Sequence, residues 1–158
     1  SVILHNCGSY INLKEVGENS YKIIMSTELI GISHKERMIV ATAVRYLRDY
    51  FPEYSQLQDS FDKEEYVRIA KINAILRLAD AMDRSHKQKF TAITTTLRSQ
   101  VLTITGSTLY DITLEHGIFQ NHSDFFEEVF GIQPILKQKK TMTPKHIEST
   151  KGKNGGRP

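Results

Sequence analysis

Residues 68–86 read RIAKINAILRLADAMDRSH, and their apolar positions cover more than one face of a predicted helix. Asp62 followed by Glu65 marks the start of this helix, because each side chain can bond the other's free backbone N–H group. A helix with apolar residues on several sides needs neighbours on several sides, so residues 62–84 are predicted to be the central helix of a bundle. The apolar positions are Ile69, Ala70, Ile72, Ala74, Ile75, Leu78, Ala79 and Met82.

A second helix is predicted over residues 34–50. Ser33 and Glu36 form a capping box at its start, and Pro52 ends it because proline restricts the preceding residue and lacks a backbone donor. Two more helices are predicted upstream, at residues 2–12 and at residues 19–29 with Asn19 as the N-cap.

The pattern changes after His86, where threonine and other β-branched residues alternate with polar ones. Residues 90–97 and 101–105 are predicted to form a β-hairpin. Residues 111–119 fit either a strand or a helix. A short amphipathic helix over 123–130, stopped by Gly131, and a possible third strand over 132–136 complete the pattern.

These elements predict a mainly α fold with a small β part, in the α+β class. The predicted domains are a helical bundle over residues 1–89, a small α+β subdomain over 90–140 packed on it, and a disordered basic tail over 141–158. Because the chain opens at Ser1 inside an apolar, helix-like run, we expect it to be a fragment with further domains upstream.

The net charge of +3 is unevenly distributed along the chain. Residues 137–158 hold seven Lys or Arg against Glu148 alone, whereas residues 1–136 hold 14 basic and 17 acidic residues. A slightly acidic body has no general attraction for nucleic acid, so we expect no nucleic-acid partner. A single cysteine, Cys7, and the lack of a bilayer-spanning apolar run predict a cytoplasmic protein without a membrane partner.

Several motifs share their order and spacing with a known family. They are HNCG at residues 5–8, NSY at 19–21, RYLR at 45–48, the stretch from 76 to 86, and FEEVFG at 126–131. Together they resemble the C-terminal HD-like domain of the Ppx/GppA family, which contains exopolyphosphatases and guanosine pentaphosphate phosphohydrolases. The resemblance covers about residues 1–139.

This resemblance implies a non-catalytic domain of a larger hydrolase. In the family, catalysis belongs to N-terminal actin-like domains that use Mg²⁺, so no cofactor is expected in this chain. The C-terminal domain contributes to holding polyphosphate or a guanosine pentaphosphate-like ligand and to dimer contacts. The expected partners are therefore such a ligand, the chain's own N-terminal actin-like domains and a second copy.

The resemblance also indicates a degenerate metal site. His5 keeps the first half of the His-Asp pair and Asp80 matches a late aspartate, but Asn6 and Asn19 replace an acid and a histidine. A neutral amide is a much weaker partner for a divalent cation than a carboxylate. We therefore expect no metal, and a vestigial pocket in which His5, Asn6, Asn19 and Asp80 hydrogen-bond one another.

Phosphate binding is expected from two groups of basic residues. Arg37, Arg45 and Arg48 would fall within an arc of about 80° on one helix. Arg77 and Arg84 flank Asp80 at ion-pair spacing, so they are either ligand contacts or structural partners of that carboxylate. The full predicted set is Arg37, Arg45, Arg48, Arg77, Arg84, His86 and Lys87.

Two other functions remain open at this point. One is an active, metal-dependent HD phosphohydrolase acting on nucleotides or (p)ppGpp, against which Asn6 and Asn19 count. The other is a purely architectural dimerisation module, in which the arginines are ordinary solvated residues on helix faces.

Overall fold

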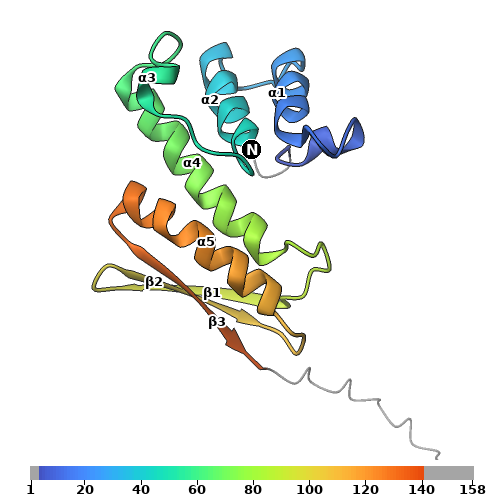
Figure 1. The fold of residues 1–158 in the computed structure, drawn as a ribbon, viewed down its shortest axis with the longest axis vertical. Helices are drawn as coiled ribbons and strands as arrows, with labels where there is room; N and C mark the ends of the chain where they lie inside the picture. The colour runs from blue at the N-terminus through green and yellow to red at the C-terminus, as the bar shows by residue number, and fades with distance from the viewer. Residues whose placement is uncertain (1–3, 141–158) are drawn as a thin grey trace, which may run out of the picture.

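The computed structural model describes residues 4–140, and it confirms the mainly α, α+β fold. Its long helix α4 connects an upper part, made of the preceding helices, to a lower part made of α5 and a sheet (Figure 1). The helical elements are η1 (Cys7–Tyr10), α1 (Val16–Ser26), α2 (His34–Arg45), α3 (Tyr54–Leu57), α4 (Lys63–Met82) and α5 (Thr113–Phe130). The strands are β1 (Ala92–Arg98), β2 (Val101–Ser107) and β3 (Gln133–Lys139).

Helix α4 is the central helix, as predicted, because it supplies residues to three apolar cores. Ala74 and Leu78 belong to the core shared with α5 and the sheet. Ile69 and Ala70 belong to a second core with α2. Leu76 belongs to a third core with α1 and α2. Most of the apolar residues predicted for this helix therefore pack against neighbours, whereas Ile75 is 54% exposed.

Both predicted capping boxes are formed. Ser33 N–H donates to Glu36 Oε2 at 2.7 Å while Ser33 Oγ accepts from Glu36 N–H at 3.2 Å. Asp62 and Glu65 make the same reciprocal bonds, each at 2.9 Å. Local chemistry therefore fixes where α2 and α4 begin.

The end of α2 differs from the prediction. The helix stops at Arg45 rather than continuing to Tyr50. The Arg77 guanidinium, from α4, donates to the backbone carbonyls of Tyr46 and Asp49. These bonds satisfy carbonyls in the turn that follows α2, and they come from a residue about thirty positions away.

The N-terminal helices also differ from the prediction. The described part of the first segment contains only the short 3₁₀ helix η1, and α1 begins at Val16 with Glu15 as its N-cap. Asn19 therefore lies inside α1 and is buried. Gly8 packs so closely on α1 that an added Cβ would lie 2.2 Å from the Val16 carbonyl oxygen, and its N–H donates to Ser20 Oγ at 2.9 Å.

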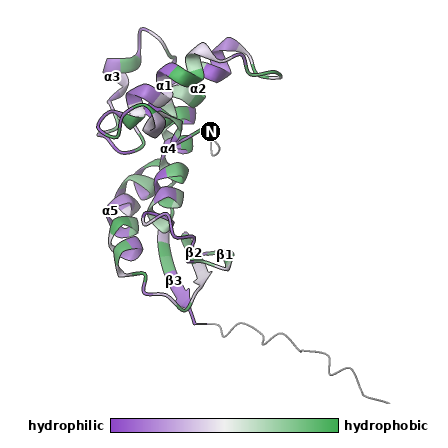
Figure 2. Ribbon diagram, turned by 90° about the vertical axis from the view of Figure 1, so that its right-hand side faces the viewer, coloured by the Kyte–Doolittle hydropathy of each residue, from purple (hydrophilic) through white to green (hydrophobic). Residues whose placement is uncertain are grey.

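The sheet has the order β1-β2-β3, with β1 and β2 antiparallel and β3 parallel to β2. The hairpin is as predicted, and Ser99 and Gln100 at its turn have positive φ angles, as tight hairpin turns require. The possible third strand is confirmed as β3. Figure 2 shows that β3 lies nearest to α5 and β1 farthest from it.

Residues 111–119, which fitted a strand or a helix, belong mostly to α5. This helix runs without a break over 113–130 rather than starting at 123, and Gly131 ends it in the left-handed region (φ 66°) as predicted. The helix packs along α4 and against β3. It forms the crossover that the parallel pair β2 and β3 needs.

The boundary expected at residues 89/90 falls in the connection between α4 and β1. The expected tail, residues 141–158, lies outside the described residues. Across residues 4–140, every helix is too short or too polar to cross a bilayer.

Candidate functional site

The main charged cluster is built around Asp80, in the last turn of α4. Its side chain is only 5% exposed, and it holds two arginines. Oδ1 accepts from Arg48 at 3.1 Å and Oδ2 accepts from Arg84 at 2.7 Å. Burial alone would raise the pKa of Asp80, but the hydrogen bonds and charges of the two arginines outweigh burial and lower that pKa.

Arg48 and Arg84 remain partly open to solvent, with 32% and 35% of their side chains exposed. Each guanidinium carries five N–H donors in a planar fork, and Asp80 engages only one nitrogen of each. The three ionised groups have a net charge of +1. The arrangement can therefore present fixed, spare donors and positive charge to an anion.

His122 of α5 belongs to the same electrostatic environment. Burial lowers its pKa most, the positive charges of Arg77 and Arg84 lower it further, and Asp80 opposes them. The imidazole is therefore neutral at pH 7. Sequence analysis did not single out His122, because its spacing from Asp80 gives no sign that α5 packs beside the end of α4.

Arg77 does not pair with Asp80. It is 9% exposed, donates to the carbonyls of Tyr46 and Asp49, and lies over the Phe125 ring at 5.0 Å. Burial lowers the pKa of Arg77, and the negative charge of Asp49 partly offsets this decrease. Of the two arginines expected to flank Asp80, only Arg84 pairs with it. Arg77 bonds backbone carbonyls instead. Arg48 is the second arginine that pairs with Asp80.

Arg37, Arg45 and Arg48 do not lie on one helix as the basic ridge required, because α2 ends at Arg45. Arg37 donates to the Thr27 carbonyl at 2.7 Å and contacts His34 Nδ1 at 3.0 Å. Arg45 pairs with Glu18 at 2.8 Å and lies over the Tyr21 ring at 5.1 Å. Both residues are therefore already engaged by protein groups.

His86 and Lys87 lie exposed in the loop after α4, two and three residues beyond Arg84. His86 has a positive φ of 51°, and its N–H donates to the Asp83 carbonyl at 2.8 Å. Both side chains therefore follow Arg84 closely along the chain and are accessible to solvent.

The vestigial metal pocket lacks some of the hydrogen bonds that were expected within it. No Cα of α1, which carries Asn19, lies within 8 Å of a Cα of α4, which carries Asp80. Asn6 Oδ1 and Asn19 Nδ2 are both buried without a hydrogen-bond partner, so these two atoms do not make the expected bonds. His5 directly precedes Asn6 and is in contact with other groups.

The arrangement does not fit the divalent metal of an HD site. Both Asp80 oxygens are bound by arginine. Within residues 4–140, no three His, Cys, Asp or Glu side chains converge in a way that could hold a metal ion. No chemical step through a metal follows from these residues.

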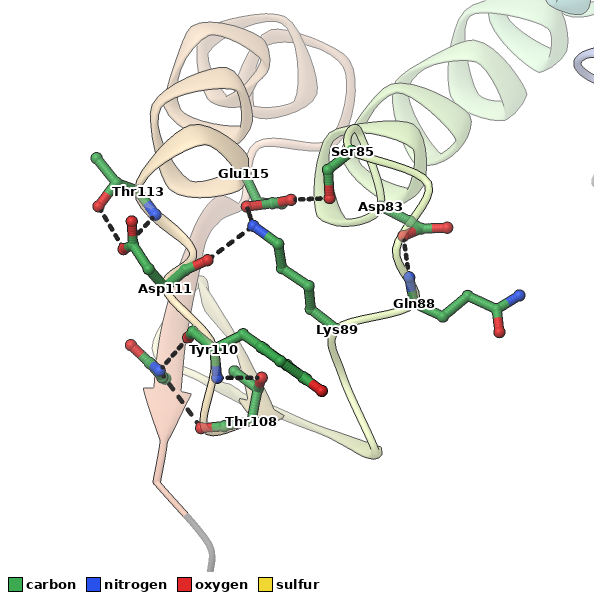
Figure 3. A network of polar contacts seen from close by, with 10 residues as sticks. Asp83, Ser85, Gln88, Lys89, Thr108, Tyr110, Asp111, Thr113 and Glu115 are labelled. Carbon is green, nitrogen blue, oxygen red and sulfur yellow. Dashed lines mark hydrogen bonds and ion pairs between the residues drawn. The ribbon is translucent and has the colours of Figure 1, made fainter.

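A second charged cluster was missed by sequence analysis. Glu115 is fully buried at the start of α5, accepts from Ser85 Oγ at 2.6 Å and pairs with Lys89 Nζ at 2.9 Å (Figure 3). Lys89 also donates to the Asp111 carbonyl at 2.7 Å. Burial raises the pKa of Glu115, but the bonds from Lys89 and Ser85 lower it overall. This cluster ties the loop after α4 to α5.

A comparison with families of known proteins gives a match. The family model described as Ppx/GppA phosphatase, domain III, matches residues 1–127. A comparison with curated individual proteins finds no match. Because the family match spans well over half of the 158 residues, the chain belongs to the Ppx/GppA phosphatase family, of which it carries domain III.

Proposed function

We propose that this domain is a non-catalytic part of an exopolyphosphatase-like or guanosine pentaphosphatase-like protein, and that it binds the polyanionic ligand through Arg48 and Arg84. The observation that carries the proposal is their arrangement: two guanidiniums, each one-third exposed, are fixed on one buried carboxylate. Catalysis, with its Mg²⁺, would belong to N-terminal actin-like domains, and the protein would be cytoplasmic.

The fixed geometry supports binding of a phosphate chain. Because Asp80 already orders both arginines, a ligand would not have to pay the entropy of ordering two long side chains. The spare N–H groups of each fork match phosphate oxygens in a bidentate manner. Lys87 and His86 could extend the positive surface along a polymer. Binding of this kind needs no base recognition and suits polyphosphate or the phosphate chain of guanosine pentaphosphate.

Binding of fluorescent polyphosphate, followed by anisotropy, tests the proposal. Replacing Arg48 or Arg84 with alanine should weaken binding roughly tenfold, which corresponds to about 1.4 kcal/mol. Arg68→Ala is a matched control, because Arg68 is an exposed arginine on α4 outside the cluster. Its affinity should stay near that of the parent chain.

Salt dependence provides the second readout. If both arginines displace counterions from the ligand, the logarithm of the affinity should fall linearly with the logarithm of salt concentration. The slope should be shallower in each cluster variant than in Arg68→Ala. Equal binding by all the variants would overturn the assignment. The chain alone should release no phosphate from polyphosphate, and release would favour the HD phosphohydrolase instead.

We further propose that the domain forms a homodimer, so that the protein presents two polyanion sites. The family resemblance supports this part of the proposal. Binding is measured by anisotropy and dimerisation by sedimentation, so either part of the proposal can fail without the other.

A further inference from the structure

The two edges of the sheet differ in how they are protected from pairing with another strand. Edge strand β3 carries Pro134, Lys137 and Lys139, and proline and lysine are residues that discourage edge-to-edge pairing. Edge strand β1 has neither proline nor charge from Ala92 to Leu97, and all seven of its residues are exposed. An unprotected edge of this kind is open to a partner strand.

One face of β1 is also apolar and uncovered. Ile93 and Leu97 stand opposite Gly106 and Leu102 of β2, so they point to the same side of the sheet as Leu102, which packs in the core under α5. Yet Ile93 is 54% exposed and Leu97 is 59% exposed. Neither α4 nor α5 comes close to the backbone of β1. At this edge, the apolar face of the sheet therefore extends beyond the area that α4 and α5 cover.

A hollow adjoins this strand. It has a volume of about 390 Å³ and opens between β1 and the end of α4. Its apolar lining comes from Ala79, Met82, Phe90 and Ile93. A side chain arriving from a strand beside β1 would find apolar surface here.

The sequence of β1 is complementary to itself. If two copies pair antiparallel about Thr95, Thr95 faces its own copy, Ile93 faces Leu97 of the second copy, and Thr94 faces Thr96. Apolar residues then meet apolar residues on the core face, and threonines meet threonines on the other face. Only Arg98 is charged, and it faces Ala92 rather than another arginine.

From this register we infer that β1 is the dimer contact of the proposed function: two copies join their free edges about a two-fold axis at Thr95. The two three-stranded sheets become one continuous sheet across the axis. A two-fold axis requires the same patch on both subunits, and the antiparallel register supplies it. This inference rests on the proposed homodimer, not on polyanion binding.

The contact should be weak. Seven paired residues and the adjoining hollow fall at or below the low end of the usual interface size of about 1,200–2,000 Å². A dissociation constant in the micromolar range is therefore expected. Sedimentation of the 158-residue chain across roughly 1–200 µM should show a shift from monomer to dimer.

Cysteine cross-linking tests the register. In a Cys7→Ser background, Thr95→Cys should form a disulfide-linked dimer on mild oxidation, because directly opposite Cβ atoms lie about 4.5–5.5 Å apart. Ala92→Cys is the matched control, since the two copies of residue 92 would be about 20 Å apart at about 3.4 Å per residue. Equal cross-linking at both positions would overturn the register.

Charge at the axis tests the contact itself. Thr95→Lys brings two ammonium groups face to face, so the dimer should be lost over the whole concentration range. Gln133→Lys, at an exposed position of β3, is the matched control and should sediment as the parent does. A dimer that persists in Thr95→Lys, or a parent chain that stays monomeric at 200 µM, would overturn the inference.

The same variants separate this inference from the proposed binding function. Thr95→Lys should keep its affinity for polyphosphate, and Arg48→Ala should keep the concentration-dependent dimer. Loss of binding in Arg48→Ala with no dimer in the parent chain would remove the inference and leave the polyanion site intact.

Discussion

Two carboxylates anchor cations near the end of α4, and they do so in opposite ways. Asp80 is shared by Arg48 and Arg84, each about one-third exposed, which leaves a net charge of +1 and spare donors. Glu115 is fully buried with Lys89, whose side chain is 15% exposed, and that pair is neutral. Lys89 also donates to a backbone carbonyl, so the protein itself uses its charge and donors.

Exposure and the ratio of cations to carboxylates decide which of the two clusters keeps charge and donors for a ligand. A buried one-to-one ion pair has no net charge to attract a ligand. It stabilises the contact between two segments of the chain. A two-to-one cluster at the surface keeps positive charge and free N–H groups.

Removing Glu115 should have the largest effect on stability. Glu115→Ala leaves the Lys89 ammonium largely buried without its counter-ion, which should cost about 3–5 kcal/mol in the free energy of unfolding. Urea denaturation followed by circular dichroism measures the loss. In the fraction that stays folded, polyphosphate affinity should be unchanged.

The double variant Glu115→Leu/Lys89→Met provides the control. It replaces the pair with apolar side chains of similar size, so it should recover much of the lost stability. A Glu115→Ala variant that loses less than about 1 kcal/mol would show that the ammonium reaches water. The distinction between the two clusters would then fail.

Neutralising Asp80 should have an intermediate effect. Asp80→Asn removes the charge that holds two like-charged guanidiniums together, and we expect a loss of about 1–3 kcal/mol at pH 7. Because the folded-state pKa of Asp80 is lowered, its contribution is complete above the unfolded pKa, near 4, and is lost as pH falls through the folded pKa.

Acid titration therefore checks this prediction. The difference in unfolding free energy between the parent chain and Asp80→Asn should be constant from pH 7 to about 5 and should shrink below about pH 4. A difference that stays constant down to pH 2 would mean that the carboxylate is not stabilised by its arginines.

Much of the fold could be predicted because its signals are local. The capping boxes at Ser33 and Asp62 involve residues three positions apart, and the apolar pattern of α4 lies within one segment. The end of α2 could not be predicted, because Arg77 reaches it from α4. The start of α1 packs closely against Gly8, a tertiary contact that spacing along the chain does not indicate.

The candidate site likewise combines a local contact, which the sequence could predict, with a long-range contact, which it could not. Arg84 and Asp80 are four residues apart on one helix, so their pairing follows from spacing. Arg48 joins them from 32 residues away, and its place depends on the early end of α2. Arg77 has equally good spacing from Asp80 but turns to backbone carbonyls. Spacing alone could not choose between Arg48 and Arg77.

A smaller effect should come from His122, whose folded-state pKa is lowered. Its neutral form is favoured by folding, so its contribution to stability is complete above the unfolded pKa, near 6.5, and is lost as pH falls through the folded pKa. A bound phosphate chain would instead favour the charged imidazole. Polyphosphate affinity should therefore rise by a few-fold from pH 8 to pH 5.

His122→Gln should reduce this rise in affinity, whereas His116→Gln, a change on the same helix, should preserve it. Anisotropy titrations at constant ionic strength provide the measurement. If both variants behave like the parent chain, then His122 does not face the bound anion and the site is limited to the arginines.

The smallest effect is expected from the arginines that the fold already uses. Arg45 is paired with Glu18 and lies over Tyr21, so Arg45→Ala should reduce polyphosphate affinity less than twofold. The Glu18→Gln variant sharpens the test, because it frees the Arg45 guanidinium from its counter-ion without removing it. If exposed charge that is not already paired governs binding, Glu18→Gln should raise the affinity slightly while Arg45→Ala leaves it nearly unchanged. A loss in Arg45→Ala as large as that in Arg48→Ala would instead show that a cation paired with a surface carboxylate is as available to a phosphate chain as one held at Asp80.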